Sequence, residues 1–236
     1  MLKNYGALFG ERFDTGPPEV LALHGWGRDR TDFHEALRGV DAVAVDLPGF
    51  GASPAPEAPM GTTGYAAVCT PVLGDFVDPP ILLGHSFGGR VALRLALDNQ
   101  VRALVLVGVP LVQLGGTGPS LRFRVWKSLH QVGAVSSERM EAVRQKYGSA
   151  DYRAARGVMR DVLVRVLSES YEDELDQLTC PVELIWGSDD EEVPLDVAEQ
   201  ARRLIPTSEL TVLPGVGHQL PREAPQDLRA VLERLI

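Results

Sequence analysis

The sequence predicts an α/β domain built on a mostly parallel sheet with helices on both faces. Six short runs rich in Val, Ile and Leu lack polar alternation, which is typical of strands buried on both sides. These runs are residues 20–25, 42–49, 81–86, 103–110, 182–187 and 210–215. Helical patterns separate several of them, and this alternation indicates the doubly wound class.

Four amphipathic segments account for the covering helices, because their apolar residues recur at helical spacing. They are residues 33–40, 88–100, 195–205 and 224–236. Residues 7–13 predict an antiparallel strand at the edge of the sheet. The Pro- and Gly-rich residues 52–64 predict a loop.

Residues 111–178 break the alternation, because several helical patterns follow one another there with no strand between them. We expect them to form a helical lid, with residues 1–110 and 179–236 as the core. Ligands bind along the carboxyl edge of open α/β sheets, and a lid inserted between two strands would cover that edge.

Composition limits the function classes. The chain has 236 residues, of which 44% are hydrophobic and 23% charged, as expected for one large globular domain. A net charge of −9 argues against nucleic acid as a partner. No apolar run is long enough to span a membrane, and the first residues lack a signal-peptide pattern, so we expect a cytoplasmic protein. Cys69 and Cys180 form no metal-ligand pattern, and we expect two reduced thiols and no metal site.

Ser86 lies in the stretch LLGHSFGGR, between Gly84 and Gly88. A G-x-S-x-G match arises by chance in roughly one chain of this length in ten. Here it follows a predicted strand and precedes a predicted helix, which is the context of a nucleophile elbow. Glycines leave room at such a sharp turn, and the helix N-terminus favours negative charge near the serine.

A serine hydroxyl needs a base to become nucleophilic, and that base needs an orienting carboxylate. Among five histidines, His218 lies between the last predicted strand and the last predicted helix, where a loop can reach over Ser86. The other four, His24, His34, His85 and His130, fit structural or surface roles. Residues 189–192 offer four acids after a strand. The residues alone leave the choice among them open.

Five motifs follow one another in the order and spacing of the α/β-hydrolase family. They are HGWG (24–27), DLPGFGAS (46–53), GHSFGG (84–89), WGSDDEEVP (186–194) and GVGHQLPREAP (215–225). The chain therefore resembles this family over nearly its whole length. The resemblance implies an α/β-hydrolase fold, with a mostly parallel central sheet, helices on both faces and a helical lid inserted after strand 6.

The resemblance also implies roles for individual residues. The family pattern G-x-x-D-x-x-V-P selects Asp190 over Asp189 as the acid beside the base. Ser86, Asp190 and His218 would be catalytic, and no cofactor would be needed. The backbone N–H groups of Trp26 and Phe87 would form the oxyanion hole. A serine nucleophile disfavours epoxide hydrolase and haloalkane dehalogenase activities, whose family members carry Asp there.

Two further residues of these motifs have expected structural roles. His24 would brace its loop and would not act as a second base. Asp46 would brace the DLPGFG turn.

Arg90, Phe50 and Trp126 are candidate substrate-binding residues. Residues 113–165 hold ten Arg or Lys and four acids, so a basic lid could attract an anionic substrate. Each of these interpretations has a structural alternative. The charges of residues 113–165 could simply be solvated helix faces. Arg90 could equally extend from its helix to solvent, and Phe50 could equally be a core residue.

The expected function is a serine hydrolase of a small carboxylic ester or thioester. The alternatives are a C–C hydrolase or lyase resembling those of menaquinone synthesis, a cofactor-free haloperoxidase, and a ligand receptor without turnover.

Overall fold

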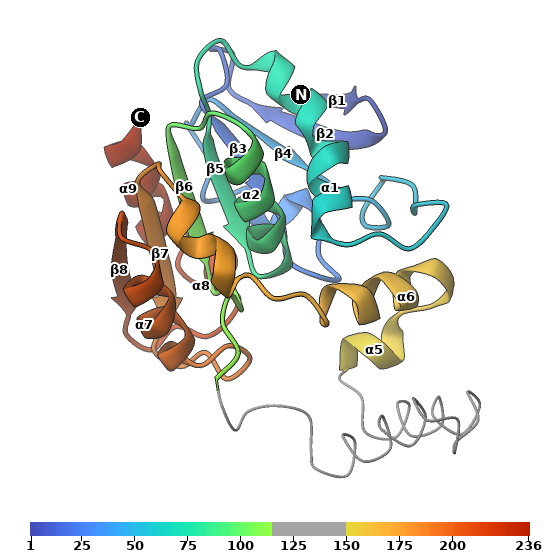
Figure 1. Cartoon of the computed structure of the whole chain (residues 1–236). Coiled ribbons are helices and arrows are strands. Elements are labelled where there is room, and N and C mark those ends of the chain that lie inside the picture. The colour runs from blue at the N-terminus through green and yellow to red at the C-terminus, as the bar shows by residue number, and fades with distance from the viewer. Residues whose placement is uncertain (115–149) are drawn as a thin grey trace, which may run out of the picture.

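The computed structural model describes residues 1–114 and 150–236. Within them, eight strands form one sheet in the order β1-β2-β4-β3-β5-β6-β7-β8 (Figure 1). The strands are β1 (Leu2–Tyr5), β2 (Leu8–Phe13), β3 (Val20–Leu23), β4 (Ala42–Val45), β5 (Ile81–His85), β6 (Ala103–Val107), β7 (Val182–Gly187) and β8 (Ser208–Leu213). From β4 to β8 in this order every neighbouring pair is parallel, which confirms the α/β class.

The antiparallel strand predicted at residues 7–13 exists as β2, which pairs with β4. It is not the edge of the sheet, because β1 pairs antiparallel along its outer side. The prediction missed β1 because three of its four residues are exposed, so the strand carries no apolar run. Gly6, with φ of +63°, makes the tight turn that folds β1 back on β2.

Helices cover both faces of the sheet, as predicted (Figure 1). The α-helices are α1 (Thr62–Cys69), α2 (Phe87–Asp98), α5 (Ala150–Ala154), α6 (Gly157–Val166), α7 (Leu195–Leu204), α8 (Leu220–Glu223) and α9 (Pro225–Leu235). The 3-10 helices are η1 (Arg30–Phe33), η2 (Thr70–Asp75) and η3 (Glu172–Gln177). No helix in the described part of the chain is long and apolar enough to cross a membrane.

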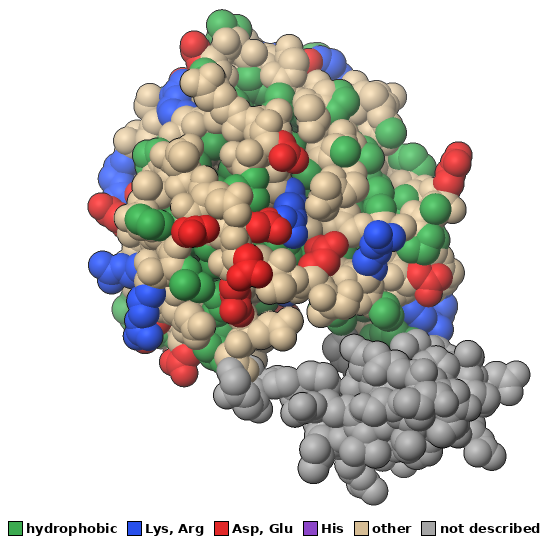
Figure 2. All heavy atoms as spheres, in the orientation of Figure 1, with side chains coloured by type: hydrophobic (Ala, Val, Ile, Leu, Met, Phe, Trp, Pro, Cys, Tyr) green, Lys and Arg blue, Asp and Glu red, His purple; other side chains and the backbone are tan. Residues whose placement is uncertain are grey.

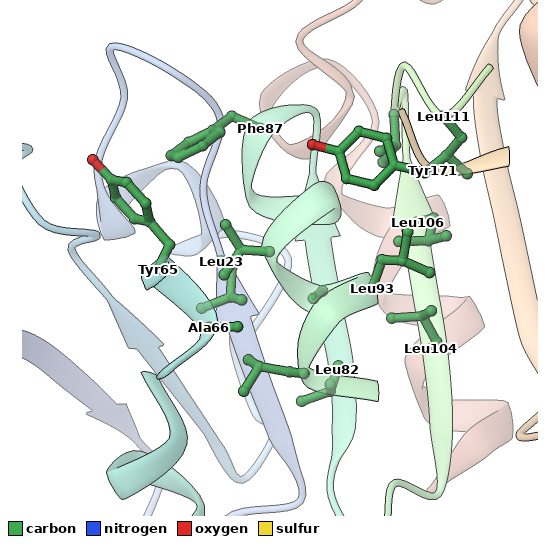
Figure 3. Packing of buried hydrophobic residues seen from close by; sticks show 14 of the residues in the cluster. Leu23, Tyr65, Ala66, Leu82, Phe87, Leu93, Leu104, Leu106, Leu111 and Tyr171 are labelled. Atoms are coloured by element: carbon green, nitrogen blue, oxygen red, sulfur yellow. The ribbon is translucent and has the colours of Figure 1, made fainter. Parts of the chain in front are cut away.

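Alternate residues of each central strand pack on opposite sides of the sheet, as the two-residue period of a strand requires. Leu82, Leu104 and Leu106 pack on the side that carries α1, α2 and α7, and Figure 3 shows them beside Leu93 of α2. The intervening residues, such as Val105, pack against α9 and the segment around η1. The sheet is therefore a middle layer between two apolar clusters, and it fixes the positions of the loops at its carboxyl edge.

Two local predictions were wrong. Residues 33–40 form no α-helix: after η1 the chain continues in irregular turns and reaches Gly39 at φ +79°. Their amphipathic spacing is real, because Phe33, Ala36 and Leu37 are all buried, but it comes from consecutive turns. Residues 52–64, predicted as a loop, already include the start of α1 at Thr62.

The described part of the predicted helical segment 111–178 contains α5 and α6, separated by a short break before Gly157 at φ +51°. In Figure 1 both helices lie beyond the end of the sheet where the parallel strands finish. Contacts tie α6 to the core: Met159 Sδ lies 3.9 Å from the Tyr65 hydroxyl, and Arg165 donates to the Pro59 carbonyl over 3.2 Å.

Candidate active site

Ser86 occupies the turn between β5 and α2 in a strained backbone conformation, with φ of 48° and ψ of −111°. In the described part of the chain, Asp14 is the only other non-glycine residue with positive φ. Such a conformation costs about 1–3 kcal/mol and persists only where its surroundings enforce it. Here the Ser86 N–H donates to the Val107 carbonyl over 2.9 Å, and the Ser86 carbonyl accepts from Gly89 N–H over 3.1 Å.

The glycines of the motif are required by close backbone approach. A Cβ on Gly88 would collide with the carbonyl of Leu23 and lie 2.5 Å from the carbonyl oxygen of His24, both fixed parts of the backbone. A Cβ on Gly84 would collide with the backbone of Gly88 and Gly89. The sharp elbow therefore brings α2 directly against the ends of β3 and β5, and the interpretation of the motif from sequence has a structural basis.

His218 and Asp190 form a buried hydrogen-bonded pair. His218 Nδ1–H donates to Asp190 Oδ2 over 2.8 Å, and the Asp190 side chain is fully buried. Asp190 Oδ1 accepts from the backbone N–H groups of Glu192 and Val193 at 2.9 and 2.8 Å, which fixes the carboxylate. Asp189 is exposed and accepts from the Ser188 hydroxyl instead. The structure thus places Asp190, and not Asp189, beside His218.

The loops after β6, β7 and β8 hold this pair beside the elbow. Trp186 Nε1–H donates to the Val193 carbonyl over 2.8 Å and closes the turn that carries Asp190. Gly108 follows Val107, the residue that binds Ser86 N–H, and a Cβ on Gly108 would lie 3.2–3.3 Å from the side chains of His218 and Asp190. The three residues predicted to be catalytic therefore gather at the ends of neighbouring strands.

His85 connects the elbow directly to the His218 loop. Its Nε2–H donates to the His218 carbonyl over 2.8 Å, and the two imidazole rings lie 5.0 Å apart. Burial, reinforced by the nearby His218, lowers the pKa of His85 to about 4. His85 is therefore a neutral positioning residue. The alternation of a strand predicts that it points away from Ser86, but nothing in the sequence indicates its bond to the His218 backbone.

The acid–base properties of His218 follow from its neighbours. Burial acts to lower its pKa, but the hydrogen bond and charge of Asp190, followed by the charges of Glu192 and Glu223, raise the pKa above its ordinary value. With Nδ1 held by Asp190, Nε2 is the nitrogen left to exchange a proton. This is the arrangement of a general base oriented by a carboxylate.

His24 and Asp46 brace the loops around the site, as predicted. His24 Nδ1–H donates to the Gly25 carbonyl, and its Nε2 accepts from Leu47 N–H, at 2.8 and 2.9 Å. Burial lowers the pKa of His24, which favours the neutral ring, and both of its nitrogens are hydrogen-bonded in that form. Asp46 accepts from Arg30 and Ala52, which fixes the DLPGFG turn.

The residues predicted to form the oxyanion hole lie side by side, with the rings of Trp26 and Phe87 5.3 Å apart. Phe87 is the first residue of α2, so its N–H has no acceptor within the helix. Phe50 packs edge-on against Trp26 at 4.9 Å, and Tyr65 against Phe87 at 5.0 Å. Figure 3 shows the rings of Tyr65 and Phe87 next to each other. These four rings form an aromatic wall beside Ser86, made of Trp26, Phe50, Tyr65 and Phe87.

The candidate substrate-binding residues differ in their surroundings. Arg90 Nε–H donates to the Pro110 carbonyl over 3.1 Å and Nη1–H to the Val166 carbonyl over 3.2 Å, with its guanidinium above the Tyr171 ring. It joins α2 to the residue just before the insertion and to the end of α6 within it. Phe50 is half-buried within the aromatic wall. Trp126 lies outside the described residues, as does most of the basic segment 113–165.

The described residues contain no group of three side chains suited to hold a metal ion.

Glu192 is a site residue that the sequence did not separate from the other acids of residues 189–192. Its Oε2 lies 3.7 Å from His218 Nε2. The folded path of the loop after β7 determines that Asp190 lies at His218 Nδ1 and Glu192 near Nε2, and the sequence does not reveal that path.

Comparisons with known proteins show which proteins the chain resembles. The chain is 29% identical to a pimeloyl-[acyl-carrier protein] methyl ester esterase of Aeromonas hydrophila, over 96% of this chain and 98% of that protein. It is 28% identical to a 2-hydroxy-6-oxononadienedioate/2-hydroxy-6-oxononatrienedioate hydrolase of Cupriavidus pinatubonensis, over 86% and 81% of the two chains. The solved structure of a thermophilic esterase superposes with a TM-score of 0.69 at 26% identity, covering 99% of this chain and 95% of that one. The sequence pattern of the alpha/beta hydrolase family matches residues 20–231, and the chain belongs to that family.

Proposed function

We propose that this hydrolase cleaves a carboxylic ester or thioester through an acyl-serine intermediate. The observation that carries the proposal is the buried His218–Asp190 pair, 2.8 Å apart, held at the strand ends beside an elbow serine. The similarity to an esterase over almost the whole chain supports it.

The reaction follows from the positions of the groups. Ser86 Oγ attacks the acyl carbonyl while His218 Nε2 accepts the hydroxyl proton. Asp190 keeps Nδ1 protonated and stabilises the imidazolium that forms. The backbone N–H groups of Trp26 and Phe87 stabilise the oxyanion. The imidazolium then protonates the leaving oxygen or sulfur, and a water activated by His218 releases the acid and restores Ser86.

We also propose that residues 111–178 act as the lid over this site, with 1–110 and 179–236 as the core. The contacts of α6 support this, because Met159 lies against Tyr65, a member of the aromatic wall. Arg90 of α2 binds the carbonyl of Pro110, the residue just before the segment, and that of Val166 within it. Arg90, Phe50 and Trp126 remain the predicted substrate contacts, and an anionic acyl part remains a prediction from the charge of the lid.

Ser86→Ala tests the mechanism. It should lower kcat/KM for p-nitrophenyl butyrate by at least about 10³-fold, because it removes the nucleophile. A fluorophosphonate should label the unaltered protein at Ser86 and leave the variant unlabelled. The control is Ser168→Ala, which changes an exposed serine whose hydroxyl donates to the Arg165 carbonyl. Full turnover by the Ser86 variant would refute the proposal.

A second candidate is C–C bond hydrolysis by the same groups, favoured by the similarity to the Cupriavidus pinatubonensis hydrolase. A panel of esters, thioesters and vinylogous diketones separates the two, since a C–C hydrolase should turn over the diketones and leave esters nearly untouched. Labelling without turnover of any substrate would instead indicate a receptor.

A further inference from the structure

Glu192 lies against the reactive face of His218. Its Oε2 is 3.7 Å from His218 Nε2, the nitrogen on the opposite side of the ring from Asp190. The backbone N–H of Glu192 donates to Asp190 Oδ1 over 2.9 Å, so the loop that carries the carboxylate is fixed. The neighbouring Glu191 is exposed, and it makes no hydrogen bond or ion pair within residues 1–114 and 150–236.

Under the proposed function, this position brings Glu192 close to the leaving group. The leaving oxygen has to come within about 3 Å of His218 Nε2 to take its proton. Because Glu192 Oε2 is 3.7 Å from the same nitrogen, it lies within about 7 Å of that oxygen whatever the direction of approach. A charge on the alcohol part of the substrate is therefore in range of the carboxylate.

Among the described residues, the other titratable groups around His218 do not offset this negative charge. Asp190 binds Nδ1, and the charges of Glu223 on α8 and of Asp151 on α5 also act on the imidazole. His85 packs from β5 and is neutral, with a pKa of about 4. Within residues 1–114 and 150–236 the ionised groups that act on the base are carboxylates, and Glu192 lies 3.7 Å from Nε2. Figure 2 shows acidic side chains gathered across the middle of the face in view.

We propose that Glu192 determines which leaving groups the site accepts, favouring esters with a cationic or neutral alcohol part over those with an anionic one. The inference rests on the proposed ester hydrolysis and concerns the alcohol side only, so it is compatible with an anionic acyl part. Two charges about 6 Å apart in a partly solvated site correspond to about a 3- to 10-fold effect on kcat/KM once solvent screening is included. The carboxylate also stabilises the imidazolium form of His218.

The experiment compares two esters of nearly equal shape, 3-(trimethylammonio)phenyl butyrate and 3-tert-butylphenyl butyrate. Glu192→Gln should lower the ratio of their kcat/KM values, cationic over neutral, by about 3- to 10-fold relative to the unaltered protein. Glu191→Gln is the matched control and should leave the ratio unchanged. High salt should narrow the difference between Glu192→Gln and the unaltered protein, because it screens the charge.

The pH dependence of kcat/KM for the neutral ester provides a readout that a structural role would not move. Because Glu192 favours protonated His218, Glu192→Gln should shift the acidic limb to lower pH, and Glu191→Gln should not. Glu192→Ala gives a second variant and should agree with Glu192→Gln.

An unchanged ester ratio in both Glu192 variants, alongside the loss of turnover in Ser86→Ala, would overturn the inference and leave the proposed function standing. Absence of any ester turnover by the unaltered protein would overturn both.

Discussion

The buried imidazole of His85 should make the protein lose stability as the pH falls. With a pKa of about 4 in the folded chain and about 6.5 when unfolded, His85 is neutral in both states at pH 7. Below pH 6.5 the unfolded chain takes up a proton that the folded chain does not. Stability is therefore lost as the pH falls from 6.5 through 4. The difference between these two pKa values corresponds to about 3 kcal/mol in total, of which about 2 kcal/mol is lost by pH 5.

His85→Gln removes the titrating group. At pH 7 the variant should be less stable by about 1–3 kcal/mol, because the hydrogen bond to the His218 carbonyl is lost or weakened. At pH 5 this deficit should shrink by about 2 kcal/mol, since the proton uptake that penalises the natural chain is absent. Urea denaturation at pH 7, 6 and 5 measures both values, and comparing the two proteins at each pH cancels the other titrating groups.

A deficit that stays the same at pH 7 and pH 5, within about 0.5 kcal/mol, would refute this account of His85. A deficit that grows on acidification would mean that the folded state holds His85 protonated. Its Nδ1 would then need an acceptor, and within the described residues it has none.

Two further substitutions test the site and the elbow. Asp190→Asn should lower kcat by about 10²- to 10⁴-fold by releasing the His218 tautomer, while Asp189→Asn should stay within about twofold; equal losses would contradict the assignment. Gly88→Ala should destabilise the fold by about 3 kcal/mol or more, because its Cβ meets the Leu23 carbonyl. A melting temperature within about 2 °C of the natural value would show that α2 can move away.

Sequence patterns predict the parallel sheet well because β3 to β7 are buried along their whole length and therefore read as continuous apolar runs. They fail where burial does not determine structure. The exposed β1 carries no pattern, and the spacing of Phe33, Ala36 and Leu37 suits irregular turns as well as a helix. The start of helix α1 was not predicted, because its first residues continue a Pro- and Gly-rich segment.

The candidate site shows the same division. Ser86 and His218 can be predicted because their places follow from strand order and motif. Asp190 could be selected over Asp189 through the resemblance to the family and not from the residues alone, because the two backbone N–H groups that fix its carboxylate leave no trace in the hydrophobic pattern. The position of Glu192 against His218 Nε2 depends on how two loops from different strands meet. Contacts between loops that are far apart in the sequence arise only in the tertiary structure, so local sequence patterns do not predict them.

Arg90 has a consequence for how this protein can change over evolutionary time. One guanidinium binds carbonyls at Pro110 and at Val166, so the chain departs from the core and comes back to it at nearly the same place. Between these points a change in chain length before α5 should leave the pairing of β6 with β7 in place, because loop-closure entropy grows slowly with length. The groups proposed for hydrolysis, Ser86, Asp190 and His218, are all carried by other parts of the chain. New substrate preferences can therefore arise by recombination at a single junction, with the chemistry inherited intact.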